Sequence, residues 1–247
     1  MCRFIAYLGP RVRLGDILVA RPHSLVAQAR APRFQTFGTG NGDGFGICWR
    51  EGQTLRRTAS VRPIWAEPAL ASIAETGSSA FLAVVRSATP GLDVCKENTP
   101  PYVRGSYAFA HNGAVDGFVG DPCALRSLVP ETGLAHVQGT TDSELLFALV
   151  LDMVAGGADP ARALKLSTTL VAGRLGGRLN QVLLEGHRIV AVAWGNSLYV
   201  KRGDEVAVAS EPYDDDPRWR LVPDRSLVDA DRSGVTVAPI QRQEAHA

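Results

Sequence analysis

The chain has 247 residues, of which 45% are hydrophobic and 21% charged, and its 26 basic and 25 acidic side chains leave a net charge of +1. This composition is that of an ordinary globular protein, long enough to bury a large core. The balanced charge argues against an extended surface for nucleic acid or for an anionic membrane, so we expect neither as a partner. The longest apolar run, within 145–154, is too short to span a bilayer.

The cysteines and histidines show no metal-binding pattern. There is neither a CxxC pair nor an HExxH sequence, so we expect no metal and no cofactor; the cysteines are Cys2, Cys48, Cys95 and Cys123. Arginine interrupts the N-terminal stretch where a signal peptide would be apolar, which predicts a reduced, cytoplasmic protein. Without repeats or a polar linker, we predict one domain over 1–247, with a frayed tail at 241–247.

The first half of the chain predicts mainly strands. The apolar stretch 2–8 predicts a buried strand, and the glycine-dense stretch 38–46 predicts a turn that leads into a second strand. A short helix is expected at 67–75. Further strands are expected at 79–87 and 105–113, each with polar residues at its C-terminal end.

Two longer helices are predicted next. In 141–157 apolar residues recur every four positions until a Gly-Gly pair, and 159–173 begins with an Asp-Pro pair that suits an N-cap and first turn. Four short β-rich stretches follow between 179 and 211. Strands, then two helices, then strands predict an α+β layered domain rather than alternating βαβ units.

Cys2 stands directly after the initiator methionine. Removal of that methionine would leave a thiol and a free α-amine on one residue, and the mature chain would begin at Cys2. An α-amine has a pKa of about 7.7–8.0, so it can accept the thiol proton near neutral pH. One residue would then supply both nucleophile and base. The alternative is a small hydrophobic residue buried at the start of a strand.

Two central motifs have two interpretations each. The sequence HNG at 111–113 predicts a hairpin turn, or an oxyanion hole in which the amide of Asn112 and the N–H of Gly113 face a developing negative charge. Arg86 ends an apolar run, and its planar guanidinium suits a carboxylate, to which Thr89 could add a hydroxyl. Alternatively, Arg86 leaves the sheet for solvent or pairs within the protein.

Two acidic motifs lie further along the chain. In TTDSE at 140–144, either Thr141 or Asp142 is expected to cap the following helix, and the carboxylate of Asp142 could instead bind a substrate ammonium. The acidic run 211–219 is expected to be a solvated loop.

In this order, the N-terminal cysteine, the Arg-x-x-Thr motif, HNG and TDSE resemble the class II glutamine amidotransferases, which belong to the N-terminal-nucleophile hydrolases. The resemblance covers most of the chain. It implies a four-layer αββα sandwich, which agrees with the predicted α+β order. It also implies that Cys2 is the nucleophile and base, and that Asn112 and Gly113 form the oxyanion hole.

The same resemblance implies how a glutamyl group is held. Arg86, with Thr89, would bind its α-carboxylate, and Asp142 would bind its α-ammonium. Short segments are similar to the branch of the family that hydrolyses γ-glutamyl-hercynylcysteine sulfoxide in ergothioneine biosynthesis; they lie at 22–34, 41–46, 62–69, 86–91 and 209–219.

This branch implies hydrolysis through a thioester on Cys2, with a small-molecule γ-glutamyl substrate and glutamate and hercynylcysteine sulfoxide as products. The permanent cation of such a substrate is expected against a Trp or Tyr face, or near Asp214–Asp216. Many class II enzymes have histidine where this chain has Val84, and Arg-Gly where it has Asn41-Gly42. Both departures argue against free glutamine as the preferred substrate.

Three alternatives remain open. The chain could be a glutaminase that supplies ammonia to a separate synthetase partner. It could hydrolyse another γ-glutamyl metabolite. It could also be a catalytically silent γ-glutamyl-binding module.

Overall fold

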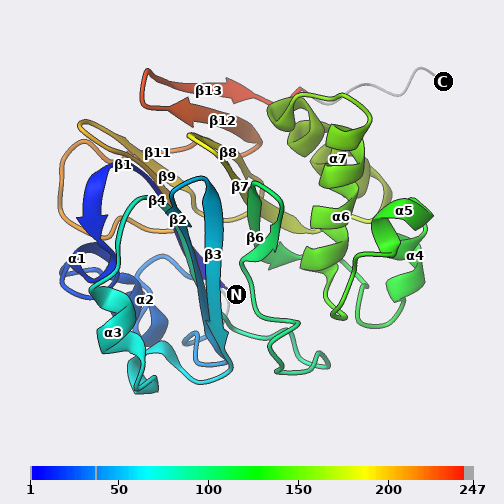
Figure 1. Ribbon diagram of the computed structural model, residues 1–247. Helices are drawn as coiled ribbons and strands as arrows, with labels where there is room; N and C mark the ends of the chain where they lie inside the picture. The colour runs from blue at the N-terminus through cyan, green and yellow to red at the C-terminus, as the bar shows by residue number, and fades with distance from the viewer. Residues whose placement is uncertain (1, 37, 242–247) are drawn as a thin grey trace.

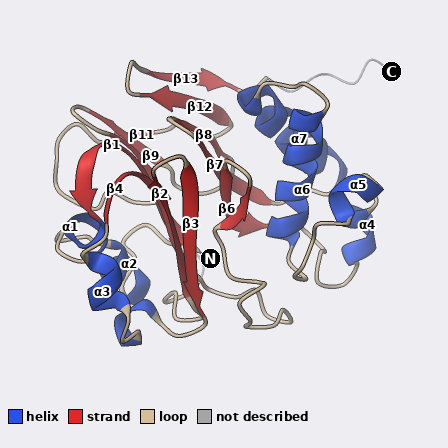
Figure 2. Ribbon diagram, in the orientation of Figure 1, coloured by secondary structure: helices blue, strands red, loops and turns tan. Residues whose placement is uncertain are grey.

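A computed structural model of the protein describes residues 2–36 and 38–241. Two antiparallel β-sheets stack face to face, and one group of helices covers the outer side of each sheet (Figures 1 and 2). The predicted four-layer αββα sandwich is therefore confirmed. Met1, on whose removal the role of Cys2 depends, lies outside the described residues, as does the predicted frayed tail beyond 241.

The first sheet has the strand order β11-β9-β10-β1-β4-β2-β3. Its strands are β1 (Arg3–Arg13), β2 (Phe45–Glu51), β3 (Thr54–Ser60), β4 (Gly77–Val85), β9 (Tyr199–Arg202), β10 (Val206–Ala209) and β11 (Arg220–Leu221). The second sheet has the order β13-β12-β8-β7-β6-β5. Its strands are β5 (Tyr102–Arg104), β6 (Tyr107–Ala114), β7 (Arg178–Glu185), β8 (Arg188–Ala193), β12 (Ser226–Asp231) and β13 (Val235–Pro239).

The helices divide into two groups. The outer face of the first sheet is covered by α1 (Leu14–Leu18), α2 (Leu25–Arg30), a 3₁₀ turn (Ile64–Ala66) and α3 (Leu70–Ala74). The second sheet is covered by α6 (Asp142–Ala155) and α7 (Pro160–Arg174), with α4 (Pro122–Arg126) and α5 (Glu131–Leu134) packed on α6. The two long helices predicted from the sequence are confirmed, and Asp159 caps α7 as expected. None of the helices in the described ranges combines the length and apolar character needed to cross a membrane.

The side chains of β1 alternate between the two buried layers on either face of the first sheet. Phe4 and Ala6 point into the core between the two sheets, whereas Ile5 and Tyr7 point to the outer layer with α1 and α2. All four are buried, because β1 is covered on both faces. The predicted strand at 2–8 is therefore confirmed, and it continues to Arg13.

The acidic run 211–219 is not the solvated loop that the sequence predicted. Tyr213 and Trp219 are buried and pack edge to face. Lys201 on β9 is 2% exposed. Its Nζ lies 3.1 Å from Asp214 Oδ2 and 2.9 Å from Glu205 Oε1. The same nitrogen lies 4.4 Å from the centre of the Tyr213 ring. A single buried lysine therefore gathers the run against the sheet through ion pairs and a cation–π contact.

We expect the substitution Lys201→Ala to lower the free energy of unfolding by about 3 kcal/mol, because it leaves the carboxylates of Asp214 and Glu205 without their buried cation. Urea denaturation followed by circular dichroism measures this change. Arg56→Ala is the control, since its pair with Glu51 is exposed at the surface and is expected to contribute less than about 1 kcal/mol. Equal effects of the two substitutions would contradict the role given to Lys201.

Candidate active site

Residues that the sequence analysis selected from distant segments meet at one small cavity of about 30 Å³. The selected residues that line it are Cys2, Arg86, Thr89, Gly113 and Asp142. Among the described residues, Asn112 does not belong to this lining, because its side chain is fully buried beside it. A second cavity, of about 580 Å³ between α5, α6 and the β5–β6 turn, holds none of the selected residues.

Cys2 is held at the start of the central strand β1. Phe4 N–H donates to Ser210 Oγ at 3.1 Å, and Ser210 N–H donates to the carbonyl of Phe4 at 3.0 Å. The Cys2 thiol packs beside the core between the sheets, with Sγ 4.0 Å from the carbonyl oxygen of Ser87. Arg3 points the opposite way and pairs with Glu211 at 3.4 Å, in a place where burial lowers the pKa of its guanidinium. The bonds of Phe4 to Ser210 and the ion pair of Arg3 with Glu211 thus fix the backbone next to the Cys2 thiol.

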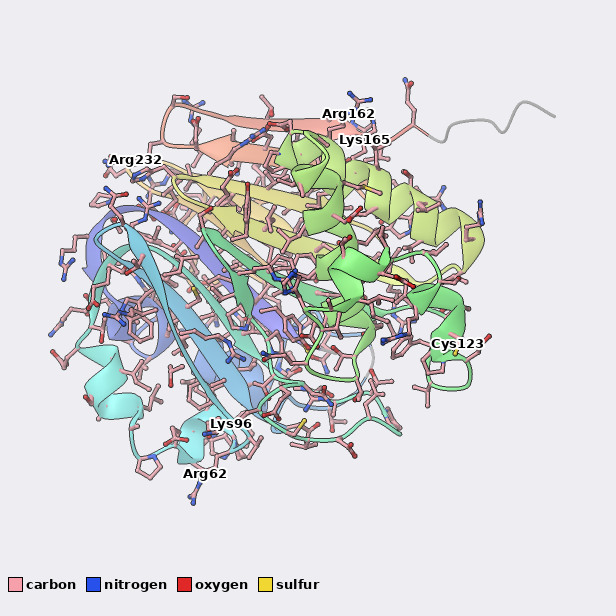
Figure 3. The ribbon with its side chains drawn as sticks, turned by 45° about the vertical axis from the view of Figure 1, so that its right-hand side comes forward. Arg62, Lys96, Cys123, Arg162, Lys165 and Arg232 are labelled. Carbon is pink, nitrogen blue, oxygen red and sulfur yellow. The ribbon has the colours of Figure 1, made fainter. Side chains whose placement is uncertain are left out.

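The other cysteines differ from Cys2 in their surroundings. Burial raises the pKa of the Cys48 thiol to about 12, so it stays protonated and packs as a hydrophobic side chain. Cys123 lies exposed on α4, in the helical layer of the second sheet (Figure 3). Of Cys2, Cys48 and Cys123, only Cys2 lines the cavity.

Asn112 and Gly113 lie inside strand β6, so the hairpin turn predicted for HNG is wrong. Leu179 N–H donates to the carbonyl of Trp194 next to β8, so by alternation the backbone of Asn180 faces β6. Asn180 is paired with Asn112. The N–H of Gly113, one residue further along, therefore points to the opposite edge of β6.

That opposite edge is open where the cavity lies. β5 begins at Tyr102, which pairs with Phe109, so in the described part of the chain no strand pairs with Gly113 on this side. The N–H of Gly113 therefore lacks a strand partner because β5 ends before it, and not because of a turn. A side chain at Gly113 would overlap the carbonyl oxygen of Arg178, which explains the glycine.

Asn112 presents a buried amide that the protein itself leaves unsatisfied. Its side chain points to the space between the sheets, as Ala108 and Ala110 do on the same strand. Neither Nδ2 nor Oδ1 has a hydrogen-bond partner among the described residues. Leaving a buried polar atom unpaired costs about 1–3 kcal/mol, so an amide of this kind beside a cavity is a candidate donor to a bound group.

Arg86 follows β4 and is 3% exposed, so it does not lead into solvent. One guanidinium nitrogen donates to the carbonyl of Asp93 at 3.0 Å, and Nη1 has no partner in the described part of the chain. Its backbone is held by the segment before β2: Arg86 N–H donates to Gly44 O at 2.8 Å, and Asp43 N–H donates to Arg86 O at 3.0 Å. Asp43 Oδ2 also accepts from Ala88 N–H at 2.8 Å. Asp43 therefore positions the loop that carries Arg86.

Asp142 is the first residue of α6, but it does not cap the helix. Thr141 is the N-cap, since its hydroxyl accepts from Glu144 N–H at 3.2 Å. Asp142 Oδ2 accepts from Val115 N–H at 2.9 Å, and Oδ1 accepts from Ser143 N–H at 2.7 Å. Ser143 Oγ also lies 3.1 Å from Oδ1. These bonds hold the carboxylate at the cavity wall and leave lone-pair capacity, chiefly on Oδ2, for a further donor.

The sequence analysis missed several residues of the lining. His111 bridges two elements, with Nδ1 3.0 Å from Ser143 Oγ and Nε2 3.0 Å from the carbonyl of Arg178. Its place in HNG was the one signal available. Tyr102 bonds the Thr141 hydroxyl at 2.7 Å, and burial raises the pKa of its phenol.

A loop between β4 and β5 supplies Asn98 and Pro100 to the lining. Arg57 on β3 holds this loop, because its guanidinium donates to the carbonyl oxygens of Pro101 at 2.7 Å and Thr99 at 2.5 Å. The local sequence gives no signal for such contacts, because Arg57 stands there only as the second of two consecutive arginines.

Asp214 and Asp216, which we expected beside a substrate cation, are occupied within the protein. Asp214 contacts Lys201 and accepts from Trp219 Nε1 at 2.7 Å, and Asp216 pairs with Arg218. Neither belongs to the cavity lining among the described residues. The position of a substrate cation therefore stays a prediction, and these two carboxylates already have partners within the protein.

Comparison with known proteins identifies the family of this chain. Residues 32–209 match the model of the class II glutamine amidotransferases. The γ-glutamyl-hercynylcysteine sulfoxide hydrolase of Mycobacterium tuberculosis (strain CDC 1551 / Oshkosh) is 36% identical over 247 residues, which cover 98% of this chain and 98% of that protein. The hydrolase of the same name from Mycolicibacterium smegmatis is 38% identical over 245 residues, which cover 97% of this chain and 100% of that protein.

Solved structures share the fold at lower identity. A glutamine aminotransferase class-II domain protein from Silicibacter pomeroyi superposes with a TM-score of 0.73 at 22% identity, over 97% of this chain and 100% of that one. The phosphoribosylpyrophosphate amidotransferase of B. subtilis superposes with a TM-score of 0.70 at 17% identity, over 97% of this chain and 49% of that one. With its sandwich fold, its cavity and a family match over most of its length, this chain belongs to the class II glutamine amidotransferases.

Proposed function

We propose that this protein hydrolyses a γ-glutamyl amide through a thioester on Cys2, and that its substrate is γ-glutamyl-hercynylcysteine sulfoxide. The observation that carries the proposal is the cavity itself. A thiol, a guanidinium nitrogen of Arg86 that is unpaired among the described residues, and the carboxylate of Asp142 come together there with Gly113, whose N–H points away from β7. The substrate is inferred from the relatives of 36–38% identity over nearly the whole chain, which are hydrolases of that compound.

The proposed reaction has two steps. The Cys2 thiolate attacks the γ-carbonyl carbon, and the α-amine freed by loss of Met1 takes the thiol proton and delivers it to the leaving nitrogen. Collapse of the tetrahedral intermediate breaks the C–N bond and leaves a glutamyl thioester. Water then attacks the thioester, and glutamate leaves with the thiol restored.

Charge complementarity accounts for the choice of a glutamyl group. The α-carboxylate would pair with the free Nη1 of Arg86, and the Thr89 hydroxyl would assist. The α-ammonium would donate to the remaining lone pairs of Asp142. During attack, negative charge develops on the carbonyl oxygen, where the N–H of Gly113 and the amide of Asn112 would stabilise it.

Purified protein and a Cys2→Ala variant, each incubated with the conjugate and with L-glutamine, test this function by mass spectrometry of released glutamate. We expect rapid release from the conjugate and slow release from glutamine. The variant is expected to lose about 10⁴-fold or more in rate, because the nucleophilic thiol is removed while the α-amine of the N-terminal residue remains. The intact mass of the same samples reports whether Met1 is gone. Release from glutamine alone would favour ammonia supply to a synthetase, and no release with Met1 retained would favour a silent binding module.

The Asp142→Asn substitution tests how the glutamyl ammonium is recognised. It keeps an oxygen for Val115 N–H but removes the charge, so kcat/KM for the conjugate is expected to fall about 10²-fold. For an analogue without the α-amine, wild type and variant are expected to be equally slow. The surface substitution Asp121→Asn, at the N-cap of α4, is the control and leaves both rates unchanged. A variant that still prefers the α-amine as strongly as wild type would contradict the role of Asp142.

A further inference from the structure

Asn196 contacts the peptide group that carries the proposed oxyanion donor. It lies in the turn after β8, and its Nδ2 donates to the carbonyl oxygen of Asn112 at 2.9 Å. That oxygen and the N–H of Gly113 belong to one planar peptide group and point to opposite sides of it. Asn196 therefore binds the carbonyl oxygen of the same peptide group whose N–H faces the cavity.

A second buried asparagine fixes Asn196 in this place. Asn180 Oδ1 accepts from Trp194 N–H at 2.7 Å and from Asn196 N–H at 3.2 Å. Asn180 Nδ2 donates to the carbonyl oxygens of Asn196 at 3.0 Å and Ser197 at 3.1 Å. The turn is thus tied to β7 through a fully buried side chain. Because a carbonyl oxygen faces the Asn196 amide, its NH₂ group and not its oxygen must be on that side.

The peptide group before Gly113 is held by β7, where Asn180 pairs with Asn112, and Asn196 adds a further bond to its carbonyl oxygen near the end of the strand. Glycine has wide backbone freedom, Gly113 is the penultimate residue of β6, and β5 begins further back, opposite Phe109. A hydrogen bond to the carbonyl limits the tilt of the peptide plane. It also polarises the N–H on the other side, since hydrogen bonds in a chain strengthen one another by about 10–30%.

We infer that Asn196, held by Asn180, is a positioning residue that orients and polarises the Gly113 N–H for the oxyanion. The inference rests on the proposed function, because the oxyanion exists only if a γ-glutamyl carbonyl is attacked. Charge appears on that oxygen in the transition state and not in the bound substrate. Loss of Asn196 therefore lowers kcat and leaves KM unchanged.

Steady-state kinetics of Asn196→Ala and Asn196→Ser on the conjugate test this role. We expect kcat to fall about 10-fold in both, less than the 10²–10³-fold typical of losing the donor itself, with KM within about 2-fold of wild type. Glutamate γ-semialdehyde gives a second readout: its aldehyde carbon bonds Cys2 Sγ while the thiol proton passes to the new oxygen. Its affinity is expected to weaken in the same proportion as kcat.

Asp224→Ala is the matched control. It removes the acceptor of Gly195 N–H, at 2.7 Å, and so loosens the same turn without touching the Asn112 peptide group. We expect it to lower the melting temperature as much as Asn196→Ala does, with kcat within about 2-fold of wild type. Equal loss of kcat in the control, or unchanged kcat in both Asn196 variants, would overturn the inference.

The amide signal of Gly113 in a ¹H–¹⁵N NMR spectrum separates this inference from the proposed function. Loss of the bond to the Asn112 carbonyl is expected to move that signal upfield in Asn196→Ala but not in Asp224→Ala, whether or not any substrate is turned over. If wild type hydrolyses no γ-glutamyl compound, the proposed function fails. If the Gly113 signal does not move in Asn196→Ala, Asn196 does not hold the peptide group, and the further inference fails.

Discussion

The site depends on the antiparallel register of β1 and β4 in the first sheet. Arg3 pairs with Val85, so the residue before β1 and the residue after β4 are brought together. These residues are Cys2 and Arg86. A nucleophile at the start of one strand and a cation at the end of its neighbour, 84 positions apart in the chain, are thereby placed at one cavity. A shift of β1 by one residue against β4 would turn the Cys2 side chain to the opposite face of the sheet from Arg86.

The second sheet contributes a different kind of group. Its β6 runs past the beginning of β5, and this stagger leaves the N–H of Gly113 without a strand partner on the cavity side. Unpaired backbone donors at a sheet edge normally face water or another chain. Here the open edge faces the thiol instead. In the proposed reaction, the first sheet supplies the reacting thiol and the second supplies the donors. The contact between the two sheets is the buried core around Phe4 and Ala110.

The sequence indicated the chemistry better than it indicated the local structure. Cys2, Arg86 and Asp142 stand out because thiol, guanidinium and carboxylate groups lie at predicted ends of elements, and the structure brings these three together. HNG was misjudged because Asn-Gly favours a turn locally, whereas pairing with β7 keeps it extended. The run 211–219 was misjudged for a similar reason, because its burial depends on Lys201, which sits on another strand.

Supporting residues could not be found from the sequence at all. Asp43, Arg57 and Asn196 hold the site through bonds to backbone carbonyls or N–H groups, and such bonds depend on the folded position of the partner and not on its side chain. A pattern of residue types therefore carries no signal for them. They are found only when the hydrogen-bond partner of each buried backbone group is identified in the structure.

The unsatisfied atoms of the site and the backbone bonds behind them form one arrangement. Asn112 keeps both side-chain atoms unpaired among the described residues, while its backbone oxygen is bonded by Asn196. Arg86 keeps Nη1 unpaired, while its backbone is bonded by Asp43 and Gly44. A polar group can stay unpaired at this cavity only if neighbouring bonds prevent it from turning to another partner. In the proposed reaction, the bonds behind the site keep these donors directed at the γ-glutamyl group.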